Sequence, residues 1–390
     1  MINNTNSGPG SYNPVGIEVV DVSAGTTAAA HFNLAHGPID TGMFFYDVLL
    51  RPDNIHVLAG IPDQEVFETP RIVTAAQDIW HQTASVWLDR QSDLRMQLRS
   101  NSGQGVGSGL WTQMIGSLSK RKVTQDFSLY NGSYSFDVSY QQQLYGFMSG
   151  IDFGREELFG LIDAWLVGVL GGYIGSRVDF DASDTTAKFQ GGTVGAYATY
   201  LNHAYFVDAL VKADFLSLDY SVPSLQPFDN KADGQARSIG ARIDSGFRVP
   251  FAATSFIDPL ATVSYVSTDI SDMALGGSNV VYGDNASLRG RVGLRVGGQV
   301  LQMPGFRTEA SLTGSVWKEF LAKNDVTIVS AGPDFITTDY FNKTFAEVSG
   351  AIDFIDLGGG FSGHLKGDFR FADALQFWSA KVKGGVRYRW

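Results

Sequence analysis

From residue 110 to the C-terminus, the chain is almost filled by long segments in which apolar and polar residues alternate. In the last segment, Val382 and Val386 fall on one face of an extended chain, and Lys381 and Arg387 fall on the other. Successive side chains of a β-strand point to opposite faces, so the alternation predicts strands with one apolar and one charged face. The segments run to about twelve residues or more, whereas strands of soluble sheets usually have about five or six. The pattern therefore favours a sheet taller than that of an ordinary soluble domain.

The connections between these segments alternate between short turns and long, polar loops. Short turns at one end and long loops at the other are typical of an up-and-down membrane barrel, in which closure satisfies every backbone group. A soluble sandwich also shows alternation, but strand length, strand number, loop asymmetry and the aromatic C-terminus favour the barrel. We therefore predict an all-β fold with a twelve-stranded antiparallel transmembrane β-barrel. Its strands are expected near 109–120, 136–153, 160–178, 188–201, 203–219, 235–251, 254–269, 286–301, 306–322, 343–356, 359–371 and 376–390.

One face of each strand should meet lipid and the other should line the barrel lumen. A charged side chain is costly in lipid, so the charged faces of the sixth, eighth and twelfth segments are expected to point inward. The facing of the third and fourth segments is ambiguous over Ala164–Tyr173 and Gln190–Tyr200. The expected lumen cations are Arg242, Arg289, Arg291, Arg295, Lys381 and Arg387.

A long helical pattern runs from Thr69 to Arg99, just before the first strand. Thr69 is a good N-cap, Pro70 suits the first helical position, and no Gly or Pro follows until Gly103. At about 1.5 Å per residue the helix could cross a bilayer, but its recurring charges exclude contact with lipid. The pattern alone also fits an amphipathic helix on a soluble core, but the strands that follow favour the barrel lumen.

The charged residues of this helix are the expected partners of the inward cations. Unpaired cations in a narrow pore would repel one another, so we expect carboxylates of the helix to pair with them, in particular Asp89 and Asp93. The charged residues that we expect on the lumen helix are Asp78, Asp89, Arg90, Asp93 and Arg95.

The composition divides the chain into four parts. Residues 1–14 predict a disordered lead-in, and short β-like runs in 15–62 predict the last coils of a short β-solenoid-like stem, with an accessory β-domain as the alternative. The linker helix occupies 63–100, and the barrel domain occupies 101–390. Because the polar N-terminus has no apolar signal-peptide core, we expect the C-terminal part of a longer protein or an excised fragment.

No pattern in the sequence predicts catalysis, a cofactor or a metal site. H-E-x-x-H, a P-loop and G-x-S-x-G are missing, and His203 and His364 are the only histidines after the helix. Asp179, Asp181 and Asp184 lack the spacing of a Ca²⁺ loop. A net charge of −11 disfavours nucleic acid, because phosphate contacts need clustered Lys and Arg. We therefore expect a chain that is not an enzyme and that binds no cofactor.

Several short motifs occur in an order and spacing that resemble a known family. They are Gly16–Val20 and the Tyr46 region, Leu110-Trp111 with Gly116, Tyr134–Val138, Gly146–Asp152 and the C-terminal Val386–Trp390. With the helix and linker that precede the barrel, they resemble the C-terminal part of a type V monomeric autotransporter. That part comprises a pertactin-like stem, a pore helix and a twelve-stranded outer-membrane β-domain.

The resemblance implies an outer-membrane translocator and anchor that exports its own N-terminal passenger. It implies a monomer in the bacterial outer membrane, with an autochaperone-like stem at the cell surface. The implied partners are outer-membrane lipid, the barrel-assembly machinery, periplasmic chaperones and the passenger segment. Val386, Tyr388 and Trp390 match the family's assembly signal. A porin-like or plugged channel is the alternative, but a porin generally begins near its first strand, without a stem and helix.

One position departs from the pattern of the family's self-cleaving branch. In that branch the backbone is cut at an Asn pair within the pore helix, whereas the comparable positions here are about Ser85-Val86. Serine cannot perform the asparagine cyclisation, so this cleavage route is not expected.

Overall fold

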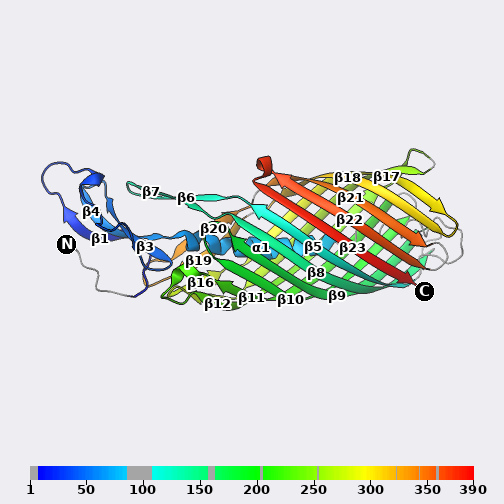
Figure 1. The fold of residues 1–390 in the computed structure, drawn as a ribbon, viewed down its shortest axis with the longest axis horizontal. Helices are drawn as coiled ribbons and strands as arrows, with labels where there is room; N and C mark the ends of the chain where they lie inside the picture. Colours follow the sequence, from blue (N-terminus) through cyan, green and yellow to red (C-terminus); the bar gives the residue numbers. More distant parts are fainter. Residues whose placement is uncertain are drawn as a thin grey trace.

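The computed structural model contains one tall barrel, a helix inside it and smaller sheets beyond one rim (Figure 1). Trp390 lies at one end of the barrel, which we term the C-terminal rim, and the opposite end is the loop-rich rim. Within the described part of the chain, no helix is both long and apolar enough to span a membrane. The structure describes residues 8–85, 108–156, 163–202, 205–252, 254–321, 323–341, 343–356 and 360–390.

Twelve antiparallel strands close the barrel. Each pairs with the next barrel strand along the chain, and β23 pairs with β5, which joins the last strand to the first. Each predicted segment corresponds to one of these strands, so the predicted barrel is confirmed. The strands are β5 (Gly109–Arg121), β8 (Tyr140–Glu156), β9 (Asp163–Phe180), β10 (Thr186–Asn202), β11 (Tyr205–Ser221), β12 (Lys231–Phe247), β14 (Ser255–Ile270), β17 (Asn285–Met303), β18 (Phe306–Glu319), β21 (Thr344–Asp356), β22 (Phe361–Ala372) and β23 (Phe377–Arg389).

The outer face of the barrel is apolar. Val292, Leu294 and Val296 of β17 are exposed there, as expected for side chains that face lipid. An apolar band with aromatic residues is the surface that a membrane barrel presents to the bilayer. The exposed aromatic residues of the strands include Tyr145, Phe147, Phe153, Tyr173, Tyr205, Phe215, Phe247, Phe361 and Tyr388.

The long connections at the loop-rich rim fold into small sheets rather than open loops. The hairpin β6 (Thr124–Leu129) and β7 (Gly132–Asp137) precedes β8, so the second barrel strand begins later than predicted. A four-stranded antiparallel sheet joins two connections that are far apart in the sequence. Its strands are β15 (Met273–Leu275), β16 (Ser278–Tyr282), β19 (Lys323–Val329) and β20 (Phe335–Tyr340). Two shorter elements of these connections are η3 (Pro223–Leu225) and η4 (Asp373–Leu375), whereas β13 (Val249–Pro250) lies at the C-terminal rim.

The stem segment forms an antiparallel sheet of four strands in the order β1, β4, β3, β2. This arrangement differs from the stacked solenoid coils that we expected for 15–62. The reason is the tight turn after β3, where Arg51 N donates to Ile55 O at 2.9 Å and reverses the chain. The elements are β1 (Asn13–Asp21), η1 (Ala29–His31), β2 (Ile39–Asp40), β3 (Phe44–Leu50) and β4 (Ile55–Pro62).

The helix α1 (Gln64–Thr83) begins earlier than predicted. Its N-cap is Asp63, whose carboxylate accepts from Gln64 N at 2.7 Å, so Pro70 lies inside the helix rather than at its first position. Proline lacks the N–H that would bond to the carbonyl four residues earlier. The Thr69 hydroxyl donates to that carbonyl, Val66 O, at 2.8 Å, which compensates for the lost backbone bond.

Candidate functional site

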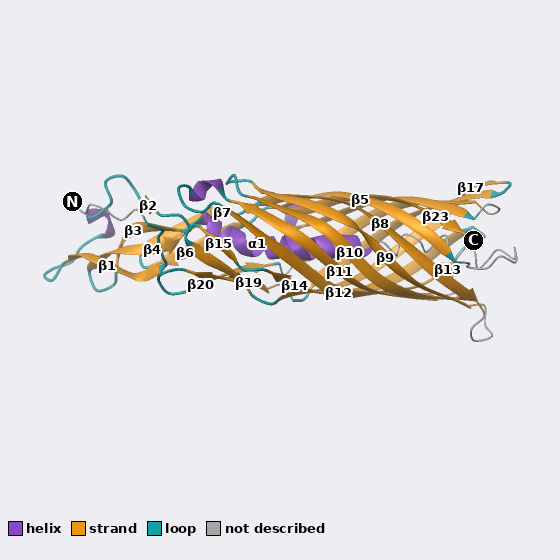
Figure 2. Ribbon diagram, turned by 90° about the horizontal axis from the view of Figure 1, so that it is seen from below, coloured by secondary structure: helices purple, strands orange, loops and turns teal. Residues whose placement is uncertain are grey.

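The candidate site is the barrel lumen together with α1, which enters it from the loop-rich rim (Figure 2). All residues of α1 other than Gln64 and Asp78 are buried. The end of the helix lies inside the barrel, between Lys212 of β11 and Lys383 of β23. The side chains that surround the helix therefore decide what the lumen can hold.

One half of the lumen wall is mainly apolar. Strands β8 to β11 contribute leucine, isoleucine and aromatic side chains that belong to one hydrophobic cluster with α1. In β9, Leu166 and Leu170 are buried in this cluster, while Val167 and Val169 are exposed on the outer face. Both faces of the strand are apolar because one meets lipid and the other meets the helix, so polarity could not assign them from sequence. The helix residues of the cluster include Ile72, Val73, Ala76, Ile79 and Trp80.

The other half of the wall carries charges of both signs, which pair mainly with one another. Every predicted lumen cation is buried, and each has a carboxylate of the wall within 4.0 Å. Because leaving a buried charge without its partner is strongly destabilising, these pairs allow the wall to bury its cations without partners from the helix. The pairs are Arg242–Asp244 (2.7 Å), Arg289–Glu319 (2.9 Å), Arg291–Asp244 (3.6 Å), Arg291–Glu347 (3.5 Å), Arg295–Glu309 (3.7 Å), Arg295–Asp353 (3.6 Å), Lys381–Asp368 (3.2 Å) and Arg387–Asp152 (3.0 Å).

Asp78 links the helix to this charged half. Its Oδ1 lies 2.9 Å from Nη1 of Arg289, and its Oδ2 accepts from Gln82 Nε2 at 2.6 Å. Arg289 therefore joins a helix carboxylate to the wall carboxylate of Glu319. The other charged residues expected on the lumen helix lie outside the described residues: Asp89, Arg90, Asp93 and Arg95.

His81 makes a second polar contact between the helix and the wall. Its Nδ1 lies 2.9 Å from Ser264 Oγ of β14, and its Nε2 lies 2.8 Å from Ser287 Oγ of β17. Sequence reasoning did not identify this contact. The available signal was spacing, because a residue three positions after Asp78 lies on the same helix face.

A polar cluster at the loop-rich rim, which we term the rim latch, consists of Thr74, Gln77, Arg121, Asn324 and Asp339. Thr74 Oγ1 donates to Asp339 Oδ2 at 2.6 Å, and Gln77 Nε2 donates to Asn324 Oδ1 at 2.9 Å. Arg121 donates to both oxygens of Asp339, at 2.5 and 2.8 Å. Burial alone would raise the pKa of Asp339, but Arg121 and Arg71 hold it well below its usual range. The latch was missed because 323–342 was expected to be a loop.

Three carboxylates stand at the N-terminal end of α1, among the loops of the rim. Ser224 Oγ donates to Glu65 Oε1 at 2.5 Å, and Ser183 Oγ donates to Glu68 Oε1 at 2.8 Å. Burial raises the pKa of both glutamates. Burial and the neighbouring charge of Glu65 raise the pKa of Asp63 to about 7. The first turn of the helix is therefore sensitive to pH near neutrality.

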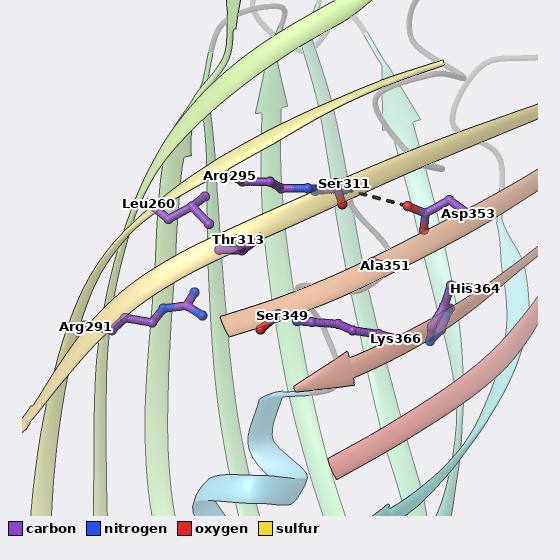
Figure 3. Close-up of a pocket in the computed structure, with 10 residues that line it drawn as sticks. All are labelled: Leu260, Arg291, Arg295, Ser311, Thr313, Ser349, Ala351, Asp353, His364 and Lys366. Atoms are coloured by element: carbon purple, nitrogen blue, oxygen red, sulfur yellow. Dashed lines mark ion pairs between the residues drawn. The ribbon is translucent and has the colours of Figure 1, made fainter. Parts of the chain in front are cut away.

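A small polar cavity lies beyond the end of α1 (Figure 3). Cations and hydroxyl groups face each other across it, and Figure 3 marks the ion pair of Arg295 with Asp353. Within the described ranges, no group of three His, Asp or Glu side chains is arranged to hold a metal ion. The cavity is lined by Leu260, Arg291, Arg295, Ser311, Thr313, Ser349, Ala351, Asp353, His364 and Lys366.

The three residues of the expected assembly signal lie at the C-terminal rim. Val386, Tyr388 and Trp390 are all exposed on the outer face. Tyr388 pairs in register with Leu110, and Trp390 N donates to Ser108 O at 3.1 Å, so the end of the chain lies against its first barrel strand.

Asp63→Asn should strengthen the first turn of α1 near neutral pH and leave it unchanged in acid. A carboxyl whose folded pKa is raised from 3.8 to about 7 favours folding fully below about pH 4, and this contribution is lost as the pH rises to about 7. Asparagine keeps the N-cap acceptor without burying a charge. Hydrogen–deuterium exchange of amides 64–67, relative to wild type at equal pH, should slow by up to about tenfold at about pH 8.

The exposed Asp21, replaced by asparagine, is the matched control and should leave this exchange unchanged at any pH. Equal slowing by Asp63→Asn at about pH 4 and about pH 8 would contradict the raised pKa.

Comparison with known proteins places this barrel in a family. A family model described as "Autotransporter beta-domain" matches residues 110–371. The pertactin autotransporters of Bordetella bronchiseptica and Bordetella parapertussis are each 25% identical over 236 residues, which is 57% of this chain and 25% of theirs. The chain thus spans about a quarter of the length of these curated relatives.

Solved structures show the same fold. The β-domain of the Bordetella autotransporter BrkA matches with a TM-score of 0.58 and 19% identity, over 73% of this chain and all of that one. The translocator domain of NalP from Neisseria meningitidis matches with a TM-score of 0.52 and 13% identity, over 81% of this chain and all of that one. The chain therefore belongs to the autotransporter family, and its barrel is an outer-membrane translocator and anchor.

Proposed function

We propose that this chain carries its own passenger through the barrel to the cell surface and remains there as the membrane anchor. The observation that supports the proposal is the path of the chain. α1 enters the lumen at the loop-rich rim, whereas Ser108, just before the first strand, lies beside Trp390 at the opposite rim. The polypeptide therefore runs from one end of the barrel to the other, as a segment that has been exported through it must do.

A porin-like channel is not favoured by the contents of the lumen. A porin keeps a water-filled passage. Here the apolar side of α1 is buried against the wall from β8 to β12, and Asp78 is paired with Arg289 on the other side. The helix is thus fitted to this wall and occupies the passage.

In the proposed orientation the loop-rich rim faces the outside of the cell. Long connections of outer-membrane barrels are extracellular, and short ones face the periplasm. The sheet of 13–62 would then lie at the cell surface, attached to the barrel by the β6–β7 hairpin. Tyr134 Oη donates to Asp47 Oδ2 at 3.0 Å, and Leu50 N donates to Asn131 Oδ1 at 2.6 Å.

Asp89 and Asp93 remain our proposed partners for cations deeper in the lumen, with Arg90 and Arg95 on the same segment. The support is charge and sequence position: these residues follow Ser85, and Arg291, Arg295 and Lys366 line the cavity beyond it. We propose that this segment, together with α1, plugs the lumen.

Deleting residues 66–99 should raise the single-channel conductance of the barrel severalfold, because α1 occupies the lumen that ions would cross. Conductance in planar bilayers is the measurement. Deleting residues 8–62 instead is the matched control and should leave conductance low, since it removes the stem but keeps the helix. If the 66–99 deletion conducts no better than wild type, the helix is not the plug.

We also propose that Val386, Tyr388 and Trp390 direct insertion by the barrel-assembly machinery. All three side chains are exposed, and they lie at the C-terminal end of the chain, where the last strand pairs with the first. Removing residues 388–390 should abolish insertion, measured as heat-modifiable barrel in the outer-membrane fraction. Trp378→Ala, at the other end of β23, is the matched control and should insert. Normal insertion of the truncated chain would contradict this role.

The sheet of 15–62 is proposed to template the folding of the passenger, as an autochaperone does. Val15 and Ile17 are exposed on β1, which is an edge strand of that sheet, and an open edge can pair with another chain. With a full β-helical passenger grafted upstream, replacing 15–62 by a Gly/Ser linker should leave the passenger exported but sensitive to protease, or stalled. A passenger that stays secreted and resistant would identify 15–62 as a passive spacer.

A further inference from the structure

Three lysine side chains converge on the C-terminal end of α1. Lys212 Nζ donates to Thr83 Oγ1 at 2.9 Å. Lys381 Nζ donates to Ser85 Oγ at 3.2 Å, and Lys383 Nζ donates to Ser85 Oγ at 3.1 Å and to Ser85 O at 3.2 Å. We term these three lysines the lysine clamp.

The clamp holds the helix end from nearly opposite walls. Lys212 lies on β11 and the other two lysines lie on β23, and these strands are five pairings apart through β10, β9, β8 and β5 in the ring of twelve. All three lysines are buried inside the barrel. A helix end held from two sides cannot shift sideways or along the lumen without losing contacts on at least one side.

The chemistry of the clamp matches the end of a helix. The last carbonyl groups of a helix lack backbone partners and carry partial negative charge, so cations stabilise them. Thr83 Oγ1 donates to Ile79 O at 2.7 Å and Ser85 Oγ donates to Gln82 O at 2.9 Å. The two hydroxyls therefore connect the ammonium groups to the carbonyl end of α1.

The clamp is held in place by the wall as well as by the helix. Lys212 pairs with Asp214 at 2.5 Å, and Lys381 pairs with Asp368 at 3.2 Å. Lys212 also lies 5.3 Å from the centre of the Trp80 ring, whose Nε1 donates to Lys212 O at 3.1 Å. Asp214 and Asp368 belong to the wall, so they position two of the three ammonium groups independently of the helix.

We propose that the lysine clamp is a receptor for the C-terminal end of the lumen helix, which fixes the depth at which the helix comes to rest. The inference rests on the proposed function, because it assumes that the chain moves through the lumen before α1 settles. The groups that the receptor recognises are the hydroxyls of Thr83 and Ser85 and the backbone carbonyl of Ser85. The clamp lysines are thus positioning residues for the translocator.

The register of α1 can be measured by crosslinking, because the chain has no native cysteine. Thr74→Cys and Asn324→Cys place one thiol on the helix and one on β19, where the native side chains are 2.8 Å apart. Dibromobimane, a short thiol crosslinker, then reports whether these positions remain opposite each other. The pair also removes part of the rim latch, so the register depends more strongly on the clamp.

In this background, Lys381→Met with Lys383→Met should slow crosslinking by about threefold or more, because two cations no longer bind the helix end. Lys343→Met, a control at the loop-rich rim whose lysine pairs with Asp373, should crosslink like the parent. Heat-modifiable migration shows that each variant is folded. If the double variant does not fold, Lys383→Met should slow crosslinking and Lys383→Arg should restore it.

Equal crosslinking in all variants would overturn the receptor, and so would an equal loss in Lys343→Met. Surface display of a passenger by the parent is scored separately. Parent protein that crosslinks normally but displays no passenger would refute export while leaving the clamp intact, so the two failures are distinguishable.

Discussion

The structure depends first on closure of the sheet. A strand in lipid cannot leave its N–H and C=O groups unpaired, and only a ring of strands pairs them all. Here the ring is completed where β23 pairs with β5, which brings the end of the chain against Gly109. That pairing places the start of the first strand at the C-terminal rim. Since α1 enters at the other rim, Ser85 lies inside the lumen while Ser108 lies at the C-terminal rim.

A ring of this size leaves a lumen, and the two halves of its wall are suited to different contents. From β8 to β11 the wall is mainly apolar, although it includes the buried pair Lys212–Asp214, and it buries the apolar side of α1. From β12 to β23 the wall contains its own carboxylates for its own cations, and Asp78 adds one helix charge at Arg289. Because leaving a buried charge without its partner is destabilising, the pairs within the wall allow its cations to be buried independently of the helix. From the sequence we expected acidic residues of the helix, rather than of the wall, to pair with most of these cations.

The barrel was predictable because alternation with period two persists over strands of more than ten residues, and the lumen cations follow from it. The remaining features depend on contacts between distant positions. Thr69 was taken as the N-cap, but it compensates for Pro70 inside the helix. Asp339 and Arg121, which form the rim latch, are 218 residues apart, so no local pattern joins them. The facing of β9 was hidden because an apolar lumen and lipid impose the same residue types on both faces.

The contacts that hold α1 suit a segment that settles in the lumen after the barrel wall has formed. Besides the apolar side of the helix and the ion pairs of Asp78 and Arg71, they are hydrogen bonds through the side chains of Thr74, Gln77, His81, Thr83 and Ser85. A hydrogen bond of this kind contributes about 1 kcal/mol net, so each can form and break while a chain slides past. The ion pairs of the wall need not break at all during such movement, since both partners belong to the barrel. The wall is thus complete before the helix settles, and the helix is held by the sum of weak contacts along its length.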